Sequence, residues 1–228
     1  MFCGEPDLPY LLKSLSEQQV EIDHRVFSYM SEIDGHNAVY QTFNTANEEY
    51  IRAKIDADIV LHPGALEKVS KLVGKNTWLD PSANDYFTNK QLHAGMAFYG
   101  RGVKFDVQTH TLKCDRNIVK NANHSSIGVI ADHSYYANEL IGFHFGYHRG
   151  LKSQLPVYND LVKAYQVHKD RVRLMAIRGF DLAQSDRYKE YHLGHSPVPT
   201  DHNYGHKLNE LFDEFKGEEI PQLTRTWR

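Results

Sequence analysis

The sequence has little cysteine and no long hydrophobic run. Its 228 residues include only two cysteines, Cys3 and Cys114, which are too few for a disulfide framework or a zinc cluster. No run approaches the roughly 18 apolar residues that a membrane-spanning helix needs. The N-terminal residues also lack the basic start and apolar stretch of a secretory signal. The sequence therefore predicts a protein without a membrane span and with a cytoplasmic location.

Two common catalytic motifs are absent as well. No Gly-x-Ser-x-Gly motif anchors a hydrolase triad, and no glycine-rich loop runs into Gly-Lys-Ser/Thr. The string Gly146-Tyr147-His148-Arg149-Gly150 has the wrong glycine spacing for a P-loop. The composition is that of an ordinary globular protein, with a net charge of −3. Residues 149–189 carry 9 basic and 4 acidic side chains, which indicates either a solvated helix face or a surface for a phosphate-bearing acceptor.

Hydrophobic spacing in the N-terminal third predicts alternating helices and strands. Helical periodicity covers 6–18 and 36–48, and β-type runs cover 24–30 and 50–55. A further helix, 65–73, follows the turn residues His-Pro-Gly. Such alternation is typical of an α/β domain with a largely parallel sheet. The remaining expected elements are strands at 94–99, 103–107 and 127–131 and helices within 134–182 and around 208–215.

Two acidic residues, Asp56 and Asp58, follow the expected strand 50–55 and precede a second apolar stretch, 59–61. Open α/β sheets bind their ligands at the carboxyl ends of strands. A hard divalent cation takes oxygen ligands and usually keeps water and substrate phosphates in its shell. The pattern therefore predicts a cation site that faces a diphosphate, and the alternative is a solvated turn.

The stretch from Glu48 to Glu67, Glu-Glu-Tyr-Ile-Arg-Ala-Lys-Ile-Asp-Ala-Asp-Ile-Val-Leu-His-Pro-Gly-Ala-Leu-Glu, resembles the central motif of family 2 glycosyltransferases. The opening Cys-Gly-Glu-Pro-Asp-Leu-Pro-Tyr-Leu-Leu-Lys-Ser-Leu, residues 3–15, is similar to the first loop and helix of that family. The resemblance covers roughly residues 1–75. It implies the GT-A fold, a Rossmann-like mixed and mostly parallel sheet flanked by helices. The expected organisation is a catalytic domain at 1–150 and a helical C-terminal extension at 151–228.

The resemblance also implies an activity and a set of site residues. The expected reaction moves a sugar, with inversion, from a nucleoside-diphosphate sugar, with UDP as the first candidate, to an acceptor hydroxyl on a glycan or on a hydroxylated base in phage DNA. Asp56 and Asp58 would bind Mn²⁺ or Mg²⁺, and His133 would complete the metal site, with His144 as second choice. Asp115 would be the general base. The residues expected at the nucleotide and the donor sugar are Cys3, Glu5, Ser31, Glu32, Asp56, Gly95 and Met96.

Two features depart from the family's pattern. Only two residues precede Cys3, so the family's first strand is expected to be missing or very short, and Cys114-Asp115 stands where the family has Glu-Asp. These departures favour an alternative, a non-catalytic nucleotide-sugar-binding or scaffold protein with the same fold. A nucleotidyltransferase is a third reading, although the expected glycine-rich basic loop is missing. Asp7 and Asp115 also have structural readings as helix caps, and His133 has one as a strand-end histidine.

Overall fold

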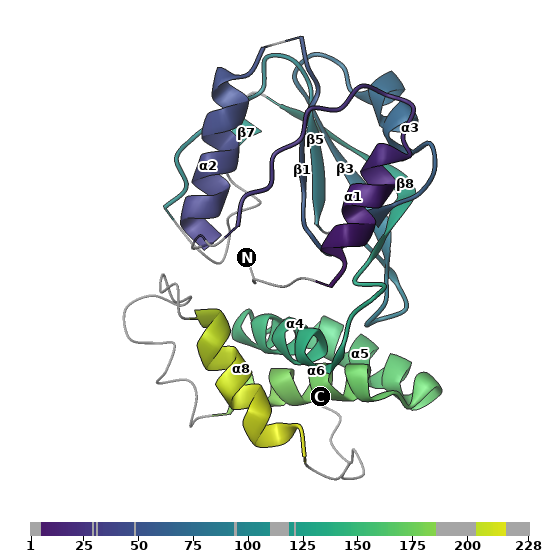
Figure 1. Ribbon diagram of the computed structural model, residues 1–228, viewed down its shortest axis with the longest axis vertical. Helices are drawn as coiled ribbons and strands as arrows, with labels where there is room; N and C mark the ends of the chain where they lie inside the picture. The colour runs from purple at the N-terminus through teal and green to yellow at the C-terminus, as the bar shows by residue number, and fades with distance from the viewer. Residues whose placement is uncertain are drawn as a thin grey trace. The chain divides into compact units, whose positions relative to one another are not determined.

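The computed structural model describes residues 6–28, 30, 32–47, 49–93, 95–109, 119–120, 122–185 and 204–217. The chain is an α/β protein that divides into two compact units (Figure 1). The first unit comprises Met1–Tyr86 and Lys90–Tyr136, and the second comprises Phe87–Asn89 and Ala137–Arg228. The expected boundary at residue 150 falls inside helix α4 (Glu139–Leu151), so the observed division precedes this helix instead of following it.

The first unit contains the sheet, and the second is helical. The helices of the first unit are α1 (Leu8–Ser16), α2 (Glu32–Thr45) and α3 (Ala65–Leu72). Its strands are β1 (Arg52–Ile55), β2 (Ile59–Leu61), β3 (Thr77–Asp85), β4 (Gln91–Leu92), β5 (Met96–Tyr99), β6 (Lys104–Phe105), β7 (Val119–Lys120) and β8 (Asn123–His133). The second unit holds α4, α5 (Leu155–His168), α6 (Arg171–Gln184) and α8 (Tyr204–Phe215). None of the helices in the described part of the chain is long and apolar enough to cross a membrane.

The main sheet is mixed, and the prediction of a mostly parallel sheet is wrong. Its strand order is β1-β5-β3-β8-β2, with β4 paired to β3. Among the described strand pairs of this sheet only β3 and β8 run parallel, while the other four pairs are antiparallel. The physical reason is that β1 and β2, neighbours in sequence, do not pair with each other but with later strands that run the opposite way.

The turn Asp56-Ala57-Asp58 joins the two end strands of this sheet. β1 and β2 lie at opposite ends of the strand order, yet only these three residues separate Ile55 from Ile59. A link of this length spans at most about 14 Å. The sheet must therefore curl until its two ends approach each other at the acidic turn.

Two apolar clusters lie on the two faces of the sheet. Successive side chains of a strand point to opposite faces, so Phe98 of β5 enters one cluster and Tyr99 the other. The first cluster includes Val69 of α3, and α1 packs against it through Leu15. The second includes Tyr40 of α2 in an aromatic group. The helices of the first unit therefore cover both faces, as expected for an α/β protein.

Helices α4 and α6 of the second unit pack with their backbones in contact. A Cβ atom on Gly142 or Gly146 of α4 would overlap a backbone carbonyl of α6, at Val172 and Ala176 respectively. In return, a Cβ atom on Gly179 of α6 would overlap a carbonyl of α4. Residues four apart lie on one helix face, and glycine permits so close a backbone approach. The glycines of α4 therefore serve helix packing.

The second unit also holds the tip of the turn between β3 and β4, residues 87–89. Arg173 of α6 is only 4% exposed and donates to the carbonyl of Phe87 and the side chain of Asn89. Its guanidinium also binds the carboxylate of Asp170 at 2.6 Å. Phe87 stacks on Phe145 of α4 with ring centroids 4.2 Å apart. These contacts fix the tip within the helical unit.

Candidate functional site

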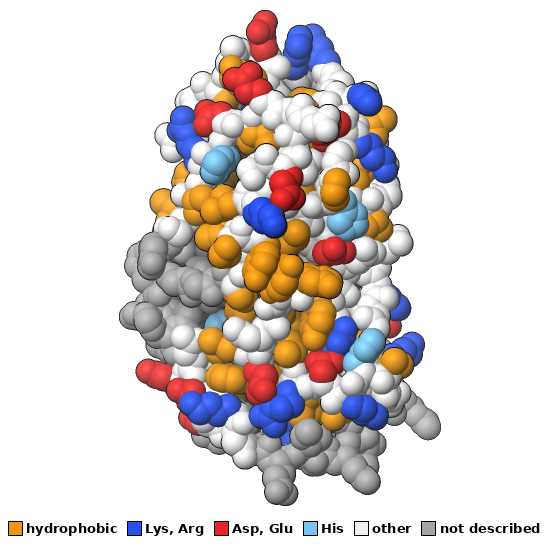
Figure 2. Space-filling view, turned by 45° about the vertical axis from the view of Figure 1, so that its right-hand side comes forward, with side chains coloured by type: hydrophobic (Ala, Val, Ile, Leu, Met, Phe, Trp, Pro, Cys, Tyr) orange, Lys and Arg blue, Asp and Glu red, His pale blue; other side chains and the backbone are white. Residues whose placement is uncertain are grey.

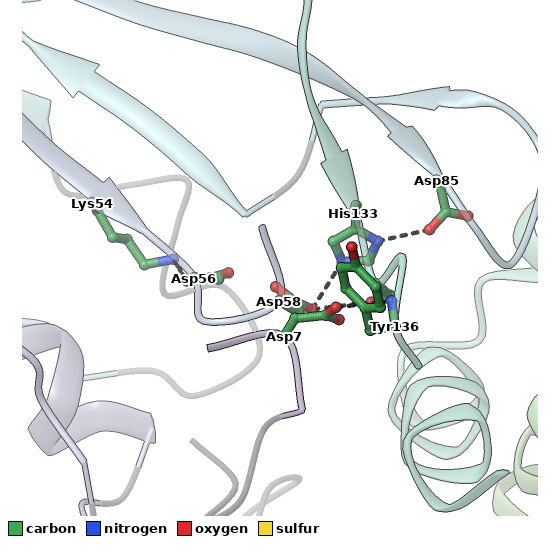
Figure 3. Close-up of polar contacts among 8 residues, drawn as sticks. Asp7, Lys54, Asp56, Asp58, Asp85, His133 and Tyr136 are labelled. Atoms are coloured by element: carbon green, nitrogen blue, oxygen red, sulfur yellow. Dashed lines mark hydrogen bonds and ion pairs between the residues drawn. The ribbon is translucent and has the colours of Figure 1, made fainter. Parts of the chain in front are cut away.

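His133, the last residue of β8, lies between two carboxylates (Figure 3). Its Nδ1 is 2.7 Å from Oδ1 of Asp85, and its Nε2 is 3.0 Å from Oδ2 of Asp58. Asp85 ends β3 and is in register with His133 across the parallel pair, so backbone pairing brings their side chains together. Asp58 comes from the turn between β1 and β2, where its carbonyl accepts a hydrogen bond from Ser134 N at 2.7 Å. The site therefore combines three separate parts of the sheet.

The charges of this group are strongly coupled. Burial alone would lower the pKa of His133, but the carboxylates of Asp58 and Asp85 outweigh it and raise the pKa to about 10. Burial would raise the pKa of Asp58, but its contact with His133 and the charge of Lys54 lower that pKa overall. At neutral pH an imidazolium thus stands between two carboxylates. The group keeps a net negative charge, which favours a further cation.

Asp7 places another carboxylate near this group. It is fully buried, at 0% exposed, and its Oδ1 accepts a hydrogen bond from Tyr136 N at 2.8 Å. Burial raises the pKa of Asp7 to about 6; the bond from Tyr136 opposes this shift, and the charge of Asp58 adds to it. Asp7 stands at the N-cap position of α1, but its side chain makes no capping bond. Asp7 therefore occupies the expected N-cap position, but its side chain binds Tyr136 N and does not cap the helix.

Two carboxylate oxygens of the site are buried without a donor. Among the described residues, Oδ2 of Asp7 and Oδ1 of Asp58 have no hydrogen-bond partner. A buried polar atom of this kind costs about 1–3 kcal/mol of stability, so native proteins rarely keep one without a use for it. A bound cation or a ligand hydroxyl is the kind of group that would satisfy them.

Asp56 has a different partner from Asp58. Its carboxylate is 45% exposed and binds the ammonium of Lys54 at 2.8 Å. Its backbone N donates to the carbonyl of Gly95 at 2.6 Å. Gly95 has a φ of +72°, and a Cβ atom there would lie only 2.8 Å from the side chain of Ile59. Gly95, expected at the donor sugar, therefore shapes the acidic turn through its backbone.

The remaining expected site residues are dispersed. Met96 is 4% exposed and lies in the apolar core, so its side chain does not face a ligand. His144 lies in α4 of the second unit, where burial lowers its pKa to about 4. Cys3, Glu5, Ser31, Asp115 and the side chain of Glu32 lie outside the described residues. Asp85 was not expected at all, because the strand that carries it was not predicted.

Among the residues that the structure describes, no three His, Cys, Asp or Glu side chains are grouped so as to hold a metal ion. Within the described part of the chain, the contact between Asp58 and His133 supplies two candidate ligands, and substrate or water would add to them. Mg²⁺ commonly binds in this way, through one or two protein carboxylates plus substrate phosphates. The geometry thus allows a cation site that a phosphate-bearing ligand would complete.

Replacing Asp7 with asparagine is expected to stabilise the protein at pH 7.5. Because burial raises the pKa of Asp7 to about 6, from 3.8, the folded state binds its proton more tightly than the unfolded state. The contribution of Asp7 to the free energy of unfolding therefore falls as the pH rises from about 4 to about 6, and stays low above that. Asparagine is neutral, and its amide oxygen can still accept the hydrogen bond from Tyr136 N. We therefore expect the free energy of unfolding to rise by about 1–2 kcal/mol at pH 7.5 and to stay unchanged at pH 4.

Urea unfolding at the two pH values measures this difference. Asp23→Asn is the matched control, because Asp23 is an exposed aspartate of the same unit. A variant at Asp7 that is no more stable than the control at pH 7.5 would show that this carboxylate is not desolvated.

Comparisons with the models of known protein families, with curated proteins and with solved structures found no match for this chain.

Proposed function

We propose that this protein is a metal-dependent, inverting glycosyltransferase of the GT-A type that uses a nucleoside-diphosphate sugar. The observation that carries the proposal is the contact of Asp58 with His133. Asp58 belongs to the motif that resembles family 2 glycosyltransferases, and His133 is the residue which that resemblance pairs with it. Both lie at strand ends where the sheet closes on itself, in the region where α/β proteins bind ligands.

The residues present fit a hard divalent cation such as Mn²⁺ or Mg²⁺. Asp58 offers a carboxylate whose Oδ1 is buried without a donor, and His133 offers an imidazole nitrogen. His133 would release its Nε2 proton on binding, because a ligating imidazole must be unprotonated at that atom. Asp85, bonded to Nδ1, would hold the ring in the right orientation, as carboxylates commonly do for ligating histidines.

The bound cation would neutralise the charge that grows on the departing nucleoside diphosphate. We assign Asp56 to the binding of the nucleotide. Its exposed carboxylate is held by Lys54 and can accept a hydrogen bond from a hydroxyl group of the nucleotide. Asp115 is proposed, from the resemblance alone, as the base that removes the proton from the acceptor hydroxyl. The acceptor oxygen then bonds to the anomeric carbon from the face opposite the diphosphate, which leaves, and the configuration inverts.

The charges of the second unit favour a glycan over a nucleic acid as acceptor. Several basic side chains of the segment 149–189 have partners within that unit: Arg171 binds Glu139 at 2.8 Å, Arg173 binds Asp170, and Arg149 lies over the ring of Phe145. On the face shown in Figure 2, the described basic and acidic side chains are interspersed. Nucleic-acid binding uses a continuous basic surface, and the pairing of these basic side chains within the unit is our reason to propose a glycan.

A thermal-shift screen of nucleoside-diphosphate sugars, UDP-sugars first, tests the proposal. We expect at least one of them to raise the melting temperature with Mn²⁺ and to lose the effect with EDTA, because the cation joins the diphosphate to Asp58. A ligand at 100 times its dissociation constant adds about 2.7 kcal/mol to the free energy of unfolding. The matching nucleosides serve as controls, since they carry no phosphate.

The absence of a shift with every such donor, with Mn²⁺ or Mg²⁺, would contradict the proposal. A donor that binds with metal but releases no nucleoside diphosphate across a broad acceptor panel would instead favour the non-catalytic binding protein.

A further inference from the structure

Three tyrosines form an exposed aromatic cluster in the first unit. Tyr10 stacks on Tyr136 with ring centroids 3.6 Å apart and an interplanar angle of 12°. Tyr135 meets Tyr136 edge to face, at 5.0 Å and 76°. The exposed fractions are 41% for Tyr10 and Tyr136 and 58% for Tyr135. Clustered aromatic rings that stay in contact with water mark binding surfaces, because covering them is favourable.

Asp7 connects this tyrosine cluster to the candidate site. Its side chain accepts from Tyr136 N, and its backbone carbonyl accepts from Tyr10 N at 2.9 Å, so one residue positions both stacked rings. On the other side, Ser134 is bonded through its backbone N to the carbonyl of Asp58. Only Tyr135 separates this anchor from Tyr136, whose ring is stacked. Tyr136, drawn with Asp7 and Asp58 in Figure 3, and Tyr10, bonded to the same Asp7, are therefore held next to the proposed reaction centre.

The chemistry of the tyrosine cluster matches a sugar ring. A pyranose has an apolar C–H face that packs on an aromatic ring, and hydroxyl groups around its rim. Each tyrosine combines an apolar ring with a phenolic hydroxyl that both donates and accepts hydrogen bonds. Binding sites of this kind are mostly apolar and aromatic, with a few polar groups that fix the ligand's orientation.

Position distinguishes the acceptor sugar from the nucleotide base. In a nucleoside-diphosphate sugar, the ribose and a second phosphate separate the base from the phosphate that carries the sugar. The acceptor hydroxyl, in contrast, must approach the anomeric carbon to about 3–3.5 Å. A surface that is tied to Asp58 by the short segment 133–136 is therefore placed for an acceptor ring.

We propose that Tyr10, Tyr135 and Tyr136 form a subsite for a pyranose ring of the acceptor, so that the acceptor is a glycan. The role of the bound sugar as acceptor rests on the proposed function, whereas binding of the pyranose ring requires neither donor nor metal. Asp7 is a positioning residue in this subsite, because it acts through the two stacked tyrosines.

Saturation-transfer NMR on the full chain, without donor, tests the subsite. The probes are the methyl β-glycosides of glucose, galactose and N-acetylglucosamine at millimolar concentration. We expect at least one glycoside to receive saturation through its C–H face, and Tyr136→Ala to reduce the signal at least fivefold. Tyr136→Phe keeps the aromatic ring and should retain most of the saturation-transfer signal. Tyr50→Ala is the matched control, because Tyr50 is a 63% exposed tyrosine of the same unit outside the cluster.

The outcomes separate this proposal from the proposed function. If no glycoside binds, or if Tyr136→Ala leaves the signal intact, the subsite is rejected, and the nucleotide-sugar screen decides the function independently. If uridine, run as a parallel probe, loses its signal in Tyr136→Ala while the glycosides do not, the cluster holds a base and the proposal is overturned. Tyr135→Ala, at the most exposed ring, gives the same readout if Tyr136→Ala does not fold.

Discussion

Replacing Asp58 with asparagine is expected to lower the rate of sugar transfer at least about 10³-fold, the loss typical when a group that stabilises transition-state charge is removed. Asparagine keeps the size of the side chain but removes the charge that a cation requires. Asp58 also supplies the buried Oδ1 without a donor and the partner of His133 Nε2. The measurements are release of nucleoside diphosphate in the presence of Mn²⁺ and calorimetric Mn²⁺ affinity with donor present.

Asp56→Asn provides the contrast for this prediction. Its carboxylate is 45% exposed and already bound by Lys54, so it has little to offer a cation held by Asp58 and His133. We expect the Mn²⁺ affinity of Asp56→Asn, measured at saturating donor, to change by less than about fivefold, since an exposed ion pair contributes about 1 kcal/mol or less. Folding of the Asp58 variant is checked by far-ultraviolet circular dichroism and urea unfolding, in parallel with Asp56→Asn. Equal loss of Mn²⁺ affinity in both variants would contradict the distinction between these aspartates.

The second large effect is expected in the helical unit, where Gly146→Ala should lower the free energy of unfolding by about 3 kcal/mol, the upper end for an overpacked core. The added methyl group would overlap the carbonyl of Ala176, a backbone atom that cannot rotate away. Helices α4 and α6 would have to separate along their length, and the packing of neighbouring glycines would loosen with them. Urea unfolding followed by far-ultraviolet circular dichroism measures the loss.

Gly128→Ala is the matched control for Gly146→Ala. Gly128 lies in β8, and nothing stands within 4 Å of a Cβ atom placed there. The control should be neutral or slightly stabilising, since alanine restricts the unfolded chain more than glycine does. If the two variants unfold at the same urea concentration, the close approach of α4 and α6 is wrong.

The elements with strong apolar periodicity were predictable from the sequence. The expected helices 6–18 and 65–73 match α1 and α3 closely, and the expected strand 50–55 contains β1. The prediction of a strand at 24–30 was wrong, since the described residues 24–28 and 30 form no strand. That run has β-forming residues, but none of the described strands pairs with it, and β-forming residues alone do not make a strand.

The central strand β3 was missed for a different reason. Its sequence, Thr-Trp-Leu-Asp-Pro-Ser-Ala-Asn-Asp, is poor in β-formers and contains Pro81, which argues against a central strand. The structure tolerates this proline because the register with β8 shifts between Pro81 and Ser82, where pairing is already irregular. Missing β3 also hid Asp85, the residue that orients His133.

From their spacing, Asp56 and Asp58 were both expected to bind the cation. In the structure they have different partners, Lys54 for Asp56 and His133 for Asp58. Residues two apart in a strand share a face, so Lys54 lies where it can bind Asp56 as the strand ends. No local pattern places His133 beside Asp58, because that contact depends on the pairing of β2 with β8. The pairing of Asp58 with His133 was expected only through the family resemblance.

The closing of the curled sheet has a consequence for the order of events during folding. The chain between Asp58 and His133 includes β3 and β5, the middle of the sheet, and β2 in the described sheet pairs with the last strand, β8. Closing so long a loop costs entropy before its contacts form. Asp58 and His133 therefore meet only when β8 has paired with β2 and the curled sheet is complete. A partly synthesised chain contains the acidic turn but not yet His133. Metal affinity would then report on completion of the native state.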